Sequence, residues 1–193
     1  NQLFISVTNP GGGASTRDDY YQYLNTYISN VKPRFISYDY YPYEGTFPNL
    51  KSGYYDNLSI IREVAMDVNI PFWVFIQTCS FGPGIRNPNK EEINWQVNTA
   101  LAYGAKGIQY FTYWSPIELS QFSAGMVTKT GEKTQTYYNV QAINNHIKAI
   151  DDVLMNSTSM GLISTGTSPV PIPQRDLITS YRQLSSVSGT VPI

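Results

Sequence analysis

Polar and aromatic side chains stand at the ends of four apolar, β-rich runs of this sequence. They are Asn9, Asp39, Gln77 and the pair Tyr113 and Trp114. Amides and carboxylates can hydrogen-bond sugar hydroxyls, and an aromatic ring can stack on the apolar C–H face of a pyranose. A carboxylate can also transfer protons or act as a nucleophile. This pattern predicts a site that handles a polar, uncharged ligand.

Asp39 is the candidate catalytic residue, and a satisfied structural carboxylate is its alternative. An acid at a strand end is costly to bury without partners. Gln77 is expected to bind substrate and not to catalyse, because an amide does not exchange protons near neutral pH. Tyr113 and Trp114 are candidate stacking platforms, with a core position as the alternative for Trp114. The remaining candidate substrate-binding residues are Asn9 and Tyr41.

Other chemistries find little support in the sequence. The single histidine and single cysteine, His146 and Cys79, leave no metal cluster and no cysteine–histidine pair, so neither a metal nor a cofactor is expected. The triple glycine at 11–13 lacks the spacing and the lysine of a phosphate loop. Glu44 and Glu118 fit solvated loop charges, and His146 fits a surface or capping position in the last helix.

The four runs cover residues 3–8, 34–39, 72–77 and 107–113. They begin about 35 residues apart, the length of one strand–helix unit with its loops. Strands that alternate with helices form parallel sheets, and chemistry then gathers at the carboxyl ends of the strands. Four units are half of an eight-fold (β/α) barrel. An open flavodoxin-like sheet is the alternative fold.

Helix signals separate these runs. Tyr20, Leu24, Tyr27, Ile28 and Val31 recur at helical spacing and predict one buried stripe. Further helices are predicted over 54–68, from a cap at Asn89 and Glu92 to Gly104, and over about 135–154. Val68, Ile150 and Leu154 are expected on the inward faces of these helices. Residues 1–155 are predicted to form the half-barrel, and 156–193 a linker or the start of a C-terminal β domain.

Composition restricts the partners. The net charge of −1 and the 14% charged residues argue against nucleic acid, and no apolar run is long enough to span a membrane. Aromatic residues make up 14% of the chain, which suits a neutral carbohydrate. The chain opens at Asn1 directly into a strand, without a signal peptide or a start methionine. We therefore expect a processed or excised piece of a larger protein.

Three stretches resemble a known family. They are FISYDYYPY at 35–43, IPFWVFIQ at 70–77 and LAYGAKGIQYFTYW at 101–114. Together they are similar to the second half of clan A (β/α)8-barrel glycoside hydrolases, with the β-galactosidase-like (family 42-like) group the closest likeness. The resemblance implies that the four runs are strands five to eight. It also implies hydrolysis of a neutral glycan, a secreted, periplasmic or cell-surface location, and a partner in the N-terminal half of the same barrel.

The resemblance also places the catalytic acids. Such retaining enzymes carry an acid/base glutamate on the fourth strand, which would precede Asn1, and a nucleophilic glutamate at the end of the seventh, where this chain has Gln77. Three explanations stay open: Asp39 or a loop acid substitutes, the missing half carries the acids, or the site only binds sugar. We expect the chain alone to be inactive. A catalytically silent carbohydrate-binding barrel and a half-barrel interaction protein are the alternatives.

Overall fold

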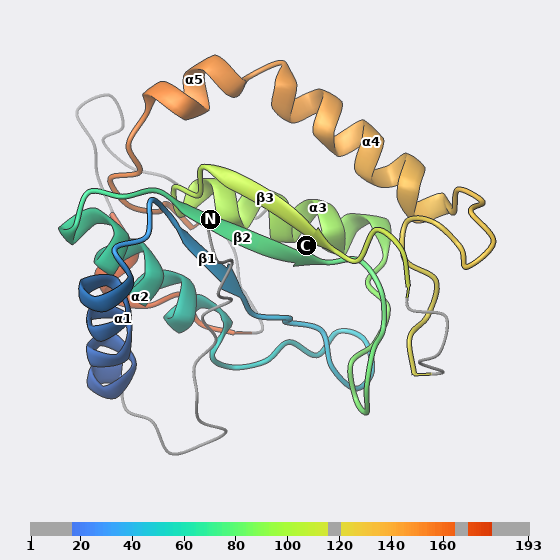
Figure 1. Ribbon diagram of the computed structural model, residues 1–193, viewed down its shortest axis with the longest axis horizontal. Helices are drawn as coiled ribbons and strands as arrows, with labels where there is room; N and C mark the ends of the chain where they lie inside the picture. Colours follow the sequence, from blue (N-terminus) through green and yellow to red (C-terminus); the bar gives the residue numbers. More distant parts are fainter. Residues whose placement is uncertain (1–16, 116–120, 165–169, 179–193) are drawn as a thin grey trace.

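The computed structural model describes residues 17–115, 121–164 and 170–178. Its centre is a parallel three-stranded sheet in the order β1-β2-β3 (Figure 1), formed by Ile36–Asp39, Phe72–Gln77 and Gly107–Phe111. Asp39 pairs with Phe75 and Gln77 with Phe111, so the carboxyl ends of all three strands meet at one edge. The predicted parallel α/β fold is confirmed for these strands. The first predicted strand and Asn9 lie outside the described residues.

Helices α2, Tyr54–Asp67, and α3, Lys90–Ala102, pack on one face of the sheet (Figure 1). Alternate residues of β2 are buried between the sheet and these helices because successive strand side chains point to opposite faces. Helix α1, Arg17–Val31, packs beside α2. The core unites both layers and includes Leu24, Ile36, Leu58, Ile61, Val64, Val74, Ile76, Val97 and Ala100.

The opposite face of the sheet carries Ser37 and Gln109, whose side chains meet across β2. Ser37 Oγ donates to Gln109 Oε1 over 3.0 Å. At the amino-terminal end of this face, the rings of Trp73 and Phe35 stack with centroids 4.4 Å apart. This face therefore carries a polar contact between β1 and β3 and, at its amino-terminal end, an aromatic stack.

The predicted cap of α3 is confirmed. Asn89 Oδ1 accepts the backbone N–H of Glu92 over 2.8 Å, and Glu92 Oε2 accepts that of Asn89 over 2.9 Å. This reciprocal pairing satisfies two N–H groups that a helix start leaves free. Gly104 follows the helix with a φ of +96°, a conformation that glycine adopts without a steric penalty. Local sequence signals thus fix both ends of α3.

The predicted helix over 135–154 is wrong in its continuity, since the structure divides it into α4, Gln135–Lys148, and α5, Asp151–Asn156. The carboxylate of Asp151 accepts the N–H of Asp152, a local bond that competes with helix continuation. Ile150, which lies between the two helices, is exposed. Val31 and Val68 are exposed as well, each at the end of its helix, so the predicted stripes reach too far.

The fourth predicted strand is also shorter than expected, because β3 ends at Phe111. The carbonyls of Thr112 and Tyr113 turn away from the sheet and accept the N–H groups of Met126 and Val127 over 3.1 and 2.8 Å. After Phe111 the backbone carbonyls therefore bond to the following loop and no longer to a neighbouring strand. Tyr113 and Trp114 belong to that loop.

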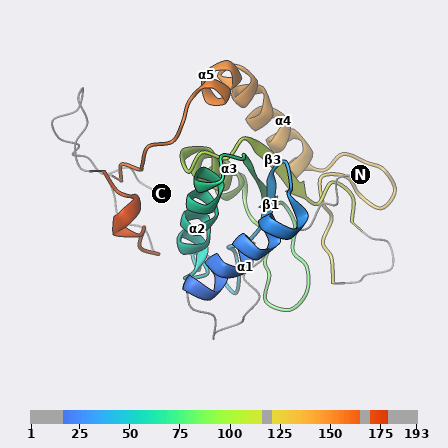
Figure 2. The same cartoon turned by 60° about the vertical axis from the view of Figure 1, so that its left-hand side comes forward.

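Part of the segment after α5 lies on the side of α2 (Figure 2). The short helix η1, Gln174–Asp176, brings the buried carboxylate of Asp176 to Ser59 Oγ at 2.8 Å and Tyr103 Oη at 3.2 Å. Arg175 adds an ion pair to Asp56 at 2.9 Å. These contacts attach 174–176 to α2 and to the residue that follows α3. Whether 156–193 begins a separate domain stays a prediction.

Within the described part of the chain, no helix has both the length and the apolar character that crossing a membrane requires.

Candidate functional site

Asp39 ends β1 with half of its carboxylate unpaired. Its Oδ1 atom is buried and has no hydrogen-bond partner within the described residues. The Tyr41 hydroxyl hydrogen-bonds Asp39, and burial together with the Asp39 charge raises the pKa of Tyr41 well above its usual range. Tyr41 therefore stays a neutral donor. A buried acceptor without a partner is unfavourable, so this oxygen is ready to receive a donor from a ligand.

Four aromatic rings gather beside Asp39, and we name them the aromatic cluster. They are Tyr41, Phe81, Phe111 and Phe122. Tyr41 lies 4.8 Å from Phe81 and 5.4 Å from Phe111 between ring centroids, and Phe81 lies 5.0 Å from Phe111 and 5.8 Å from Phe122. The rings come from the loops after β1 and β2, the last residue of β3 and the loop beyond it. Contacts at these distances are favourable and hold the loops against one another.

Sequence reasoning selected only Tyr41 from the aromatic cluster. Phe81, Phe111 and Phe122 were missed, although Phe111 and Phe81 both lie within a few residues of a predicted strand end. Proximity to a strand end was a usable signal for these two. Phe122 had none, because it comes from far along the loop after β3.

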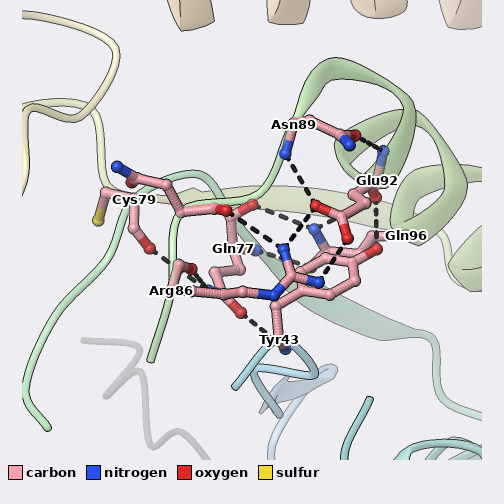
Figure 3. A network of polar contacts seen from close by, with 8 residues as sticks. Tyr43, Gln77, Cys79, Arg86, Asn89, Glu92 and Gln96 are labelled. Carbon is pink, nitrogen blue, oxygen red and sulfur yellow. Dashed lines mark hydrogen bonds and ion pairs between the residues drawn. The ribbon is translucent and has the colours of Figure 1, made fainter. Parts of the chain in front are cut away.

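Gln77, at the end of β2, is fully buried, and protein groups occupy its side chain (Figure 3). Oε1 accepts the backbone N–H of Tyr43 over 3.2 Å. Nε2 donates to the carbonyl of Arg86 over 2.6 Å and more weakly to that of Cys79 over 3.4 Å. Both amide protons are thus committed. The predicted role of Gln77 in substrate binding has no free donor to support it, and Gln77 instead joins two loops.

A second set of contacts surrounds Gln77. Gln96 of α3 pairs with the backbone N–H and carbonyl of Gln77 over 2.9 and 3.1 Å. Arg86 binds both carboxylate oxygens of Glu92, at 2.8 and 2.5 Å, and its guanidinium lies 4.8 Å from the ring centre of Tyr43 (Figure 3). The Arg86 and Glu92 side chains are only 15% and 11% exposed, so this pairing is weakly screened by solvent.

Tyr113 and Trp114 lie at the surface, 56% and 41% exposed, so the core alternative for Trp114 is wrong. Their loop is tied to the loop after β2 through Ser123. Ser123 Oγ accepts the N–H of Ser80 over 3.0 Å and donates to Asn87 Oδ1 over 2.7 Å. The two exposed rings are therefore carried by a supported loop and are free to stack on a ligand.

The remaining candidates lie elsewhere. Glu44 is exposed beside Lys51 at 3.8 Å, as a solvated loop acid should be, and His146 is exposed on α4. Glu118 and Asn9 fall outside the described residues. Burial raises the pKa of the Cys79 thiol to about 11, so this group is not a nucleophile near neutral pH. Over the described ranges, no group of three or more His, Cys, Asp or Glu side chains could hold a metal ion.

A parallel sheet with helices on its outer face, and with polar and aromatic side chains gathered at the carboxyl ends of its strands, defines an α/β protein of the kind found in β/α barrels. The family model of glycoside hydrolase family 42, described as beta-galactosidase, matches residues 17–150. The chain belongs to this family. The resemblance stated from residues 35–114 is thereby confirmed.

A solved structure of a beta-galactosidase supports the fold. The crystal structure of a beta-galactosidase from the psychrophilic Marinomonas ef1 matches with a TM-score of 0.51 and 15% identity, covering 81% of this chain and 26% of that one. A polyextremophilic beta-galactosidase from the Antarctic haloarchaeon Halorubrum lacusprofundi matches with a TM-score of 0.44 and 18% identity, covering 73% and 22%. The chain thus spans about a quarter of the length of the first enzyme. No curated protein matches it.

Proposed function

We propose that this chain forms strands five to eight of a glycoside hydrolase barrel and lines one side of a site for a neutral glycan. In this arrangement β1, β2 and β3 are strands six, seven and eight. The observation that carries the proposal is the unpaired, buried Oδ1 of Asp39 beside the aromatic cluster. A sugar hydroxyl satisfies such an oxygen, and an aromatic ring accepts the sugar's C–H face.

The site residues are proposed to contact the glycan in two ways, by hydrogen bonding and by stacking. Asp39 accepts a hydroxyl hydrogen, and the Tyr41 hydroxyl keeps the other side of the carboxylate occupied. Trp114 and Tyr113, exposed at the same end of the sheet, provide stacking surface. A β-galactoside is the first substrate class to test, because the matching family and the Marinomonas enzyme are both described as beta-galactosidase.

Hydrolysis needs more than these residues. A retaining mechanism uses two carboxyl groups about 5–5.5 Å apart. Of the three described strands, only β1 ends in a carboxylate, since β2 ends in Gln77 and β3 in Phe111. The N-terminal half of the barrel is therefore proposed to supply at least one catalytic acid, with Asp39 either as the second acid or as a substrate ligand.

The test compares two forms of the protein on an aryl β-galactoside. One is the 193-residue chain, and the other is the longest natural chain that contains it. We expect hydrolysis by the longer chain only, and we expect Asp39→Asn to reduce it at least a hundredfold if Asp39 is catalytic. Robust turnover by the 193-residue chain would contradict the assignment of a catalytic acid to the N-terminal half.

A catalytically silent carbohydrate-binding barrel is the second candidate. Two features of Gln77 favour it. The end of β2 carries this amide in place of an acid, and both amide protons are already bound by protein carbonyls. Sugar binding by the longer chain, without hydrolysis of aryl glycosides of several configurations, would support this candidate over the enzyme.

A further inference from the structure

The Gln77 amide accepts a hydrogen bond from one loop and donates a hydrogen bond to another. Its Oε1 holds the N–H of Tyr43 in the loop after β1, and its Nε2 holds the carbonyl of Arg86 in the loop after β2. The two loops also pair directly, since the N–H of Arg86 donates to the carbonyl of Tyr43 over 3.3 Å. An amide can bridge an N–H and a carbonyl because it carries both a donor and an acceptor.

A charged group could not take its place. A carboxylate at position 77 would face the carbonyl oxygens of Arg86 and Cys79 without a proton to offer them. The nearby charges are already matched, since the Arg86 guanidinium binds both oxygens of Glu92. The Tyr43 hydroxyl, also nearby, donates to the carbonyl of Glu92 over 2.8 Å. The buried position is therefore selective for a neutral donor and acceptor.

The two loops joined by Gln77 are those that carry the first two rings of the aromatic cluster. Tyr41 precedes Tyr43 by two residues, and Phe81 lies between Cys79 and Arg86. The Tyr41 and Phe81 rings meet edge to face at 4.8 Å. Fixing Tyr43 against Arg86 thus also fixes the place where these rings meet, next to Asp39.

We propose that Gln77 is a positioning residue, which locks the loops after β1 and β2 together and so sets the Tyr41–Phe81 pair that faces the glycan. The glycan in this statement rests on the proposed function. The lock itself rests only on the contacts of Gln77 and can be tested without a sugar.

The first test is amide hydrogen exchange in the 193-residue chain with Gln77→Met. Methionine keeps the length and burial of the side chain and removes its hydrogen bonds. We expect the Tyr43 amide to exchange at least about tenfold faster, because its acceptor is lost. Gln109→Met is the matched control: Gln109 is a glutamine on the adjacent strand, and its bond goes to Ser37. Unchanged exchange at Tyr43 in Gln77→Met would overturn the proposal.

The second test is the thermal unfolding of Gln77→Glu as a function of pH. At pH 7.5 we expect a Tm about 6 to 10 °C below that of the wild type, because a buried carboxylate faces two carbonyls. Burial raises the pKa of a carboxyl in the folded state, so the penalty is present at neutral pH and fades as pH falls toward the unfolded value near 4.3. At pH 4 the protonated acid can donate to the carbonyl of Arg86, and the difference in Tm should shrink to about 2 °C.

A pH-independent deficit in Gln77→Glu would contradict the proposal, because a purely steric effect does not titrate. If Gln77→Glu fails to fold at neutral pH but folds at pH 4, the proposal is supported, and Gln77→Met exchange decides it in either case. Glycan affinity separates the two claims: if the longest natural chain that contains these residues binds no β-galactoside, the proposed function is contradicted and both tests of the lock stay intact.

Discussion

The two ends of the parallel sheet differ in how their polar groups are satisfied. At the amino-terminal end, the Lys106 ammonium donates to the carbonyls of Leu154 and Ser157, which holds the end of α5 against the start of β3. At the carboxyl end, Asp39 keeps an oxygen without a protein partner in the described chain. Of these two charged residues, Lys106 is bound by carbonyls, whereas Asp39 keeps one oxygen without a partner among the described residues.

The aromatic residues follow the same division. Trp73 stacks on Phe35 and covers Gly107 at the amino-terminal end, so these two rings pack against protein groups. At the carboxyl end, Tyr113 and Trp114 stay exposed around the aromatic cluster. A shallow cavity does lie at the amino-terminal end, but Lys106, the one charged residue among the described residues that line it, is bound by carbonyls. The difference indicates that one end maintains the fold and the other meets the ligand.

The largest expected effect is on stability at the amino-terminal end. A Cβ atom added at Gly107 would lie 2.4 Å from Trp73 Cδ2. Gly107→Ala should therefore lower the free energy of unfolding by about 3 kcal/mol, at the upper end of the usual cost of overpacking. Urea unfolding measures this effect, and combining the change with Trp73→Leu should recover part of the loss. A neutral Gly107→Ala would contradict the close packing of this end.

The next effect concerns the support of the carboxyl end. Arg86→Met leaves the largely buried carboxylate of Glu92 without its bidentate partner. We expect a loss of about 2 kcal/mol in urea unfolding. Arg175→Met is the control, because its ion pair with Asp56 is well exposed and such pairs contribute at most about 1 kcal/mol. Equal losses in the two variants would show that the Arg86 pair does not support the site.

A substitution at Asp39 should reduce glycan binding without reducing the stability of the fold. Asp39→Asn should weaken β-galactoside binding at least about tenfold, since a charged acceptor contributes more to a hydrogen bond than a neutral one. Its Tm should stay within about 2 °C of the wild type or rise, because the Asn oxygen can still accept the Tyr41 hydroxyl and the other carboxylate oxygen has no partner to lose. Asp56→Asn, on exposed α2 surface, should change neither quantity. A large loss of stability in Asp39→Asn would identify a structural carboxylate instead.

Trp114 should show a smaller version of the same separation. Trp114→Ala should reduce glycan affinity about fivefold through lost stacking, and alter the free energy of unfolding by about 0.5 kcal/mol or less. Tyr138→Ala removes a similarly exposed ring from α4 and should leave affinity unchanged. Titration calorimetry of both variants measures the contrast. Equal affinities in the two variants would remove Trp114 from the site.

A last prediction concerns Cys79, whose thiol should be unreactive in the folded chain. Burial raises the pKa of its thiol to about 11, so the thiolate is a minor species at pH 8. Labelling with a chromogenic disulfide should be at least about a hundredfold slower in the folded chain than in guanidinium chloride. Rapid labelling of the native protein would show that the carboxyl end opens more than its packing implies.

Sequence reasoning located the elements whose signals are local. The bounds of β2 at Phe72 and Gln77 were predicted correctly, because Pro71 and a following polar loop limit an unbroken apolar run. The cap of α3 was equally readable from Asn89 and Glu92. The strand-end position of Asp39 followed from the same reasoning, which then predicted that it lies beside the ends of its neighbours.

Non-local contacts could not be predicted in this way. The end of β3 depends on Met126 and Val127, which capture the next carbonyls from the following loop. The hydrogen bonds of the Gln77 side chain depend on backbone groups of Tyr43 and Arg86, which come from two separate loops. No periodicity or spacing in the sequence encodes these partners. They appear only when the loops are in place.

Saturation-transfer NMR of the 193-residue chain with a β-galactoside tests the central claim most directly. Wild type and Asp39→Asn are compared under identical conditions, with Asp56→Asn as the control. The account predicts transfer to the sugar protons in the wild type and in Asp56→Asn, and a clear loss in Asp39→Asn. Equal transfer in all three proteins would contradict the assignment of the glycan site to the carboxyl end of the sheet.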